Sequence, residues 1–217
     1  MDDSEVWDVV DERRQAVVDL LGELGPGDWD RPSLCDAWTV REVAAHLTLV
    51  ALPRPRLISL FLRYPGSMNR TIRDASKAQA RRMGNEEIRE TIRSMIGLHR
   101  HFPGLTCREA LVDVLGHTLD IAIPLHREVR LPTAALAEAA DHVVSYGGTG
   151  NARVFRSLPI LRSRLIATDH DWSTGAGPEI TGTMTDLYLA LIGRTVHLDR
   201  LGGEGAEALR DAVAQPA

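Results

Sequence analysis

Apolar residues recur at helical spacing along most of the first 145 residues. The clearest amphipathic pattern covers residues 4–24, and a second begins at Thr39, which has the capping-box spacing with Glu42 and precedes a pattern that extends to about residue 52. Further helices are predicted over residues 85–101, 106–126 and 132–144, with a less regular helical region over 56–83. Five or more helices with short links favour an antiparallel bundle.

The pattern changes after Tyr146. Residues 164–168 and 179–181 are short strand candidates on either side of a turn-rich segment, and a final helix is predicted over about 184–198. We therefore expect a mainly α chain, with a helical domain over residues 1–155 and a small α+β domain over residues 156–217.

Composition and charge narrow the class of protein. The chain of 217 residues is 44% hydrophobic and 25% charged, as in ordinary globular proteins, and its net charge of −5 argues against a nucleic-acid partner. An acidic, polar amino terminus and the lack of a long apolar run predict a cytoplasmic protein without a membrane partner. Cys35 and Cys107 are then expected to be free thiols. Arginine makes up nearly all of the basic residues, Lys77 being the one lysine, which is typical of a GC-rich genome.

Candidate metal ligands lie on the helix predicted from residue 106. Asp113, His117 and Asp120 have i, i+4 and i+7 spacing, so they share one stripe of that helix. His46 is the best third donor, because it lies in mid-helix beside an apolar face where an unpaired imidazole costs desolvation free energy. Ordinary alternatives remain for each: an ion-paired histidine for His117 and a histidine bonded to a backbone carbonyl for His46.

Two stretches of the sequence resemble a known family. The first reads Trp29-x-x-Pro32-Ser33-Leu34-Cys35-x-x-Trp38-Thr39-Val40-x-x-Val43-x-x-His46-Leu47. It is similar to the amino-terminal signature of the mycothiol-dependent maleylpyruvate isomerase family, within the DinB-like four-helix-bundle superfamily. Residues 167–182 and 189–194 resemble the small second domain of that family, whereas residues 56–100 carry little of the resemblance.

The resemblance implies a DinB-like antiparallel four-helix bundle in which His46, Asp113 and His117 hold one divalent ion. The family usually has Glu at the position of Asp113; should Asp113 turn away, Asp120 or a water is the natural replacement. Zinc is the first choice of ion and nickel or iron the next, since imidazole and carboxylate donors discriminate weakly among them. An open coordination position for mycothiol is also implied, and the arginine-rich composition fits the actinobacteria that make this thiol.

Arg194 matches an arginine of the family's second domain. We expect it to hold a substrate carboxylate by a bidentate pair, the alternative being a cation that binds free carbonyls at a helix end. The predicted function is that of a mycothiol-dependent isomerase or thiol transferase. Its partners would be a small thiol and a small electrophile, acting on a monomer or homodimer. The alternative is a non-catalytic DinB-like metal-binding protein with a binding or stress-response role.

Three further features carry an ordinary interpretation beside a functional one. Cys35 is expected either to approach the metal or to act as a small buried hydrophobe. Residues 147–150 are interpreted as a flexible glycine turn rather than a phosphate loop. The run Asp169-His170-Asp171 fits turn chemistry at a strand end better than a cation site.

Overall fold

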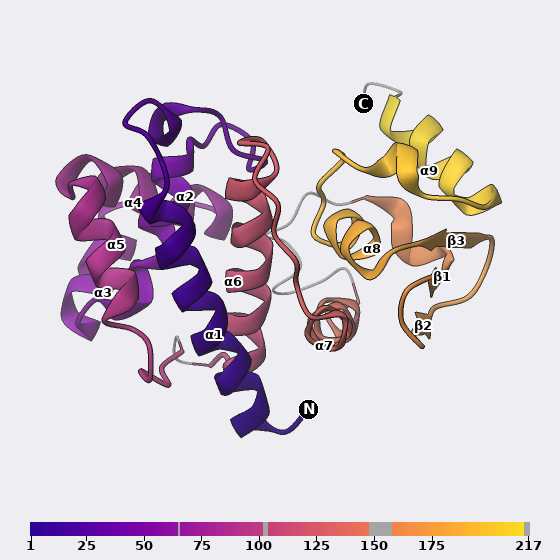
Figure 1. Cartoon of the computed structure of the whole chain (residues 1–217), viewed down its shortest axis with the longest axis horizontal. Coiled ribbons are helices and arrows are strands. Elements are labelled where there is room, and N and C mark those ends of the chain that lie inside the picture. The colour runs from indigo at the N-terminus through magenta and orange to yellow at the C-terminus, as the bar shows by residue number, and fades with distance from the viewer. Residues whose placement is uncertain (65, 102–103, 148–157, 215–217) are drawn as a thin grey trace. The chain divides into compact units, whose positions relative to one another are not determined.

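The computed structural model describes residues 1–64, 66–101, 104–147 and 158–214, apart from the side chains of residues 60 and 61. By packing, the chain divides into two compact units, residues 1–129 and 130–217 (Figure 1). The predicted boundary at residue 155 falls outside the described residues. Within the second unit, the helix over Thr133–Ser145 packs against the helix over Met184–Leu191.

The first unit is a helical bundle. Its helices are α1 Asp3–Gly22, α2 Val40–Leu47, α3 Arg54–Arg63, α4 Met68–Arg82, α5 Asn85–Arg93 and α6 Cys107–Ala122. Helix α1 packs on α5 and α6, α2 packs on α4, α5 and α6, and α3 packs on α4. The predicted helices over 85–101 and 106–126 are shorter than expected at their carboxyl ends. Helix α6 stops before Pro124, and Arg127 N–H returns to the Ala122 carbonyl, with His126 at a positive φ of 55°.

Capping boxes define the amino-terminal ends of α2 and α6. The Thr39 side chain accepts from Glu42 N–H and the Glu42 carboxylate accepts from Thr39 N–H, as the sequence predicts for α2. Thr106 and Glu109 do the same for α6. Each box satisfies amide donors that a helix start otherwise leaves without partners, so the first turns of α2 and α6 are fixed.

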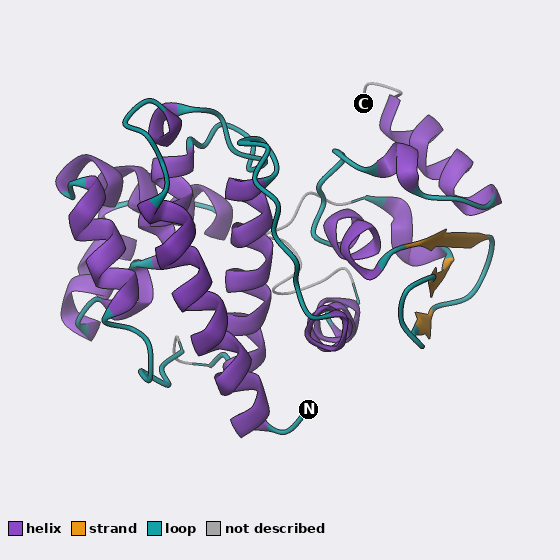
Figure 2. Ribbon diagram, viewed as in Figure 1, coloured by secondary structure: helices purple, strands orange, loops and turns teal. Residues whose placement is uncertain are grey.

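The described part of the second unit combines α-helices with a small sheet (Figure 2). Its elements are α7 Thr133–Ser145, β1 Arg164–Ala167, β2 Ser173–Thr174, β3 Glu179–Gly182, α8 Met184–Leu191 and α9 Glu204–Ala214. The strand order is β2-β1-β3, with β1 antiparallel to β2 and parallel to β3. Leu165 pairs with Ile180 across β1 and β3, and both side chains are buried. The indole N–H of Trp172 donates to Asp141 at 2.8 Å, which ties the β1–β2 turn to α7.

Two features of this unit differ from the sequence prediction. The helix predicted over 184–198 ends at Leu191, because Gly193 adopts a φ of +81° and terminates it. Helix α9 was not predicted; it packs on β3 and buries Gly205, Ala206 and Leu209. The predicted fold class, a mainly α chain with a helical bundle followed by a small α+β part, is confirmed. Among the described residues, no helix combines the length and apolar character needed to cross a membrane.

Candidate metal centre

One side chain of α2 and two of α6 meet between these helices. His46 Nε2 lies 3.2 Å from Asp113 Oδ1, and His117 Nε2 lies 3.3 Å from the same oxygen. The imidazole rings meet edge to face with centroids 4.9 Å apart, and the three donor atoms lie within 4.8 Å of one another. The structure therefore brings together the three residues that the sequence singled out as metal ligands.

The packing of the two helices explains this convergence. On α2, Val43, Ala44 and Leu47 are buried at the helix contact, so the neighbouring His46 lies at the edge of the contact. On α6, Asp113 and His117 are one turn apart on the same face, whereas Leu111 and Leu115 are buried. Because α2 packs directly on α6, this edge faces the Asp113 and His117 stripe.

The Nδ1 atom of His46 faces a hydroxyl on α4. The Ser76 hydroxyl donates to the Ile72 carbonyl at 2.7 Å, so its single hydrogen is used. Its oxygen lies 3.1 Å from His46 Nδ1 and can only accept there. This arrangement favours the tautomer with a hydrogen on Nδ1, which directs the Nε2 lone pair of His46 at Asp113.

The Nδ1 atom of His117 faces a buried carboxylate. Asp120 is fully buried, and its Oδ2 lies 2.8 Å from His117 Nδ1. A carboxylate accepts hydrogen bonds, so His117 carries a hydrogen on Nδ1 and also directs a lone pair at Asp113. Asp120 thus lies on the Nδ1 side of His117, whereas Asp113 lies on the Nε2 side.

This donor set fits a divalent cation. For bonds of about 2.0–2.2 Å, tetrahedral ligand atoms are separated by about 3.4 Å, close to the 3.2 and 3.3 Å found between the imidazole nitrogens and Asp113. Two imidazole lone pairs aimed at a carboxylate repel one another unless a proton or cation lies among them. Carboxylate or hydroxyl partners on the outer imidazole nitrogens are also what metal-bound histidines have.

In the cluster without a metal ion, the Asp113 carboxylate and the His117 imidazole shift one another's pKa. Burial raises the pKa of Asp113, but His46 and His117 lower it by more, so the net pKa lies well below the usual 3.8. Burial lowers the pKa of His117, but Asp113 raises it by more, with further help from Asp120 and Cys35, so the net pKa lies well above 6.5. A proton held in this way occupies the position that a cation would take.

The loop before α2 forms one wall of the centre. The ring of Trp38 lies 5.3 Å from that of His46 and 6.2 Å from that of His117, measured between centroids. Cys35 is half-buried, and its thiol donates to Asp120 Oδ2 at 3.0 Å. Cys35 is therefore not the small buried hydrophobe that the sequence allowed; with His117 and Asp120 it forms a second group of potential metal-ligating side chains, on the Nδ1 side of His117. The contacts of Ser76, Trp38 and Asp120 were not foreseen, because no spacing in the sequence relates residues on different helices.

The other residues singled out from the sequence belong to the second unit. Arg194 Nη1 donates to the Ile192 carbonyl at 3.1 Å, at the end of α8. Asp169 accepts from Met184 N–H at 2.7 Å, at the start of the same helix. His170 faces the Thr133 hydroxyl at 3.3 Å. The predicted glycine turn at 147–150 lies largely outside the described residues.

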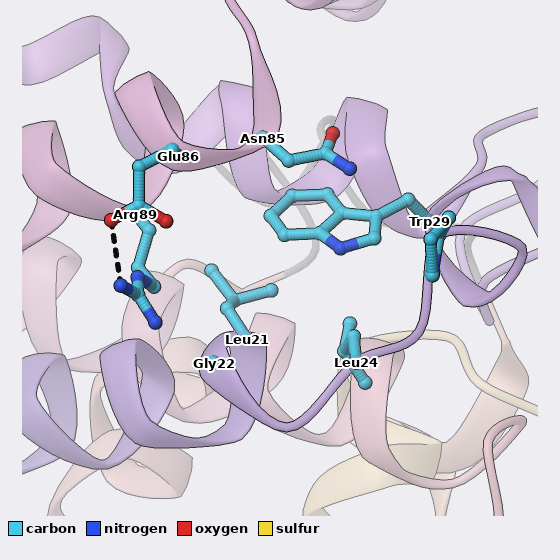
Figure 3. Close-up of a pocket in the computed structure, with 8 residues that line it drawn as sticks. Leu21, Gly22, Leu24, Trp29, Asn85, Glu86 and Arg89 are labelled. Atoms are coloured by element: carbon cyan, nitrogen blue, oxygen red, sulfur yellow. Dashed lines mark hydrogen bonds and ion pairs between the residues drawn. The ribbon is translucent and has the colours of Figure 1, made fainter.

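A pocket of about 170 Å³ lies between the carboxyl end of α1 and the amino end of α5 (Figure 3). It is lined by Leu21, Gly22, Leu24, Pro26, Trp29, Asn85, Glu86 and Arg89, with an ion pair of 2.6 Å between Arg89 and Glu86. None of these residues belongs to the cluster of His46, Asp113 and His117, so this pocket is separate from the candidate metal centre.

Comparisons with known proteins agree with the resemblance. No curated protein matches the chain by sequence. The crystal structure of the mycothiol-dependent maleylpyruvate isomerase is similar, with a TM-score of 0.62 and 12% identity over 95% of this chain and 94% of that chain. A histidine-to-alanine mutant of that isomerase gives a TM-score of 0.61 and 11% identity over the same shares. At such low identity these structures establish the fold. Residues 10–95 match the family model described as the mycothiol maleylpyruvate isomerase N-terminal domain, and the family resemblance predicted from the sequence is thereby confirmed.

Proposed function

We propose that this protein is a metal-dependent enzyme that uses mycothiol to isomerise, or to transfer the thiol to, a small electrophilic substrate. The observation that carries the proposal is the approach of His46 Nε2 and His117 Nε2 to one oxygen of Asp113, at 3.2 and 3.3 Å. The choice of thiol rests on the family match over residues 10–95.

The side chains of the centre have distinct tasks in this proposal. His46, His117 and Asp113 hold a divalent ion, zinc being the first choice. When bound, such an ion lowers the pKa of a coordinated thiol and so supplies a thiolate near neutral pH. Ser76 and Asp120 keep a hydrogen on the outer nitrogen of each imidazole, so that both inner nitrogens remain donors. Trp38 covers one side of the two rings and excludes water there.

With three protein ligands, a bound ion would keep a coordination position for an exogenous donor, as catalytic zinc sites require. In an isomerisation, the thiolate adds to a conjugated double bond of the substrate, the new single bond rotates, and elimination of the thiolate restores the double bond. In a transfer, the carbon–sulfur bond stays and another group leaves the electrophile. Arg194 is the candidate clamp for a substrate carboxylate, in competition with its role at the end of α8.

Calorimetric titration of mycothiol into the zinc-loaded protein tests the proposal. We expect saturable binding that disappears with chelator and in the variant His117→Ala. The variant Asp28→Asn is the matched control, because Asp28 is also a half-exposed carboxylate of the first unit but lies outside the metal cluster. Equal affinity for mycothiol with and without zinc would refute the thiol-binding role of the centre.

A second measurement separates an enzyme from a non-catalytic metal-binding protein. The zinc-loaded protein is mixed with mycothiol and maleylpyruvate, and the loss of the cis isomer is followed by proton NMR alongside a panel of other small electrophiles. Thiol-dependent turnover of any of them supports the enzyme. Tight thiol binding without turnover across the panel would favour a binding protein instead.

A further inference from the structure

We propose that Asp120 and Cys35 are positioning residues that hold the imidazole of His117 in its metal-binding orientation. The inference rests on the proposed metal-dependent function and deepens it, because neither residue contacts the donor atoms that face the ion. Both act on the outer nitrogen of His117, Asp120 by direct contact and Cys35 through Asp120.

Asp120 is suited to this task by burial and by its place on α6. Its side chain is fully buried, so its charge is retained only with close hydrogen-bond donors. It lies three residues after His117 on the same helix, and its Oδ2 is 2.8 Å from His117 Nδ1. This contact fixes both the rotation of the imidazole ring and the nitrogen that carries the hydrogen.

Cys35 supplies a second donor to the same oxygen. Its thiol donates to Asp120 Oδ2 at 3.0 Å, whereas its sulfur is 3.8 Å from His117 Nδ1. The main chain supports the same contact, since Leu34 N–H donates to the Asp120 carbonyl at 3.1 Å. Asp120 is therefore attached to this loop through both its backbone and its side chain.

The loop over residues 33–39 connects the contact between Cys35 and Asp120 with Trp38 and with the start of α2. Cys35 is held by its own N–H, which donates to the Ser33 hydroxyl, and its carbonyl accepts from Trp38 N–H at 3.0 Å. Ala37 between them has a positive φ of 62°, which marks a tight turn. Trp38 then lies against both imidazole rings, and Thr39 caps the helix that carries His46. The thiol thus joins the loop that leads into α2 to α6 directly behind His117.

Zinc affinity in the absence of any thiol substrate tests the proposal, measured by competition with a chromogenic chelator. We expect Asp120→Asn to weaken zinc binding about 10–100-fold, the effect of losing a partner behind a metal-bound histidine. Cys35→Ala should weaken it about threefold to tenfold, corresponding to one net hydrogen bond, while Cys35→Ser keeps a donor and binds nearly as the wild type does. Cys107→Ala is the matched control, a buried thiol outside the cluster, and should leave the affinity unchanged.

The tautomer of His117 gives a readout that a general loss of stability does not move. Nitrogen-15 NMR of the ion-free protein above the pKa of His117 should show the hydrogen on Nδ1 in the wild type and in Cys35→Ser. In Asp120→Asn we expect the Nε2–H form to become populated, because an amide can turn its NH₂ group toward Nδ1. The proposal would be overturned if Asp120→Asn kept both the zinc affinity and the His117 tautomer of the wild type. If wild-type protein bound no zinc, the proposed function would fail, and the tautomer measurement would still decide the role of Asp120.

Discussion

Replacement of Asp113 by Asn is expected to remove most of the stability that zinc adds to this protein. The carboxylate is the oxygen donor on which both imidazoles converge, and Asn keeps its size while removing its charge. Zinc at about 1,000 times its Kd stabilises the wild-type fold by about 4.1 kcal/mol. For a chain of this length that corresponds to a rise in Tm of about 8–16 °C.

The expected size of the loss follows from the position of Asp113. Loss of a partner behind a ligand already weakens metal binding about 10–100-fold, so loss of a direct ligand should cost at least about 100-fold. At the same zinc concentration the ion then adds only about 1.4 kcal/mol, or about 3–6 °C. Without zinc the variant should lose the stability that comes from the interaction of Asp113 with protonated His117, and the ion-free measurement gives this loss separately from that of the ion.

Differential scanning calorimetry with and without zinc measures both quantities on the same samples. Asp28→Asn serves again as the control, since its carboxylate is 29% exposed and should leave the zinc-dependent shift at the wild-type value. A full zinc-dependent rise in Tm for Asp113→Asn would show that Asp113 is not a ligand, and the reasoning from the 3.2 and 3.3 Å contacts would then be refuted.

Three other predictions concern pH, the second unit and Arg194. The pKa of His117 is raised in the folded, ion-free protein, so the protonated imidazole contributes its full stability below about pH 6.5 and loses it as the pH rises through the raised pKa. Urea unfolding in the presence of chelator should therefore show a lower free energy of unfolding at pH 8 than at pH 6. An unchanged or higher free energy at pH 8 would contradict the raised pKa. His197→Ala should destabilise the protein by about 1.5–3 kcal/mol, because the buried Asp186 carboxylate loses its 2.7 Å contact with His197 Nδ1 and keeps the Thr183 hydroxyl. A loss below about 0.5 kcal/mol in chemical denaturation would be inconsistent with a stabilising pair of His197 and Asp186. Arg194→Lys should change stability by no more than about 0.3–1 kcal/mol, because the Ile192 carbonyl that Arg194 binds lies at a helix end and Lys keeps the charge. A large loss of kcat/KM at unchanged Tm would identify Arg194 as a substrate clamp. Unchanged turnover of an acidic substrate would exclude that role.

The sequence was most informative where one local rule decides the structure. The capping box at Thr39 and the apolar face that follows it predicted α2, and the position of His46 beside that face indicated an imidazole in need of a partner. The spacing of Asp113 and His117 placed both on one face of α6. These inferences need only helical periodicity, which the chain order carries directly.

Helical periodicity does not predict which residues of different helices are in contact. Ser76 meets His46 across 30 residues, and Cys35 meets Asp120 across 85, so both depend on how the helices pack. The division at residue 129 follows from the packing of α7 on α8, which periodicity does not specify. Helix α9 was not predicted from the sequence; Gly205 and Ala206, two of its buried residues, are small.

Trp38 gives the centre an optical signal of its own. Its indole lies against the two imidazole rings, and protonated imidazoles and open-shell ions such as Co²⁺ or Ni²⁺ quench the emission of a nearby indole. Occupancy of the centre can therefore be followed by fluorescence without an added dye, and Trp38→Phe isolates the contribution of this indole from those of the other three tryptophans. Because the same ring senses both histidines, one emission trace reports the exchange of a proton for a metal ion in real time.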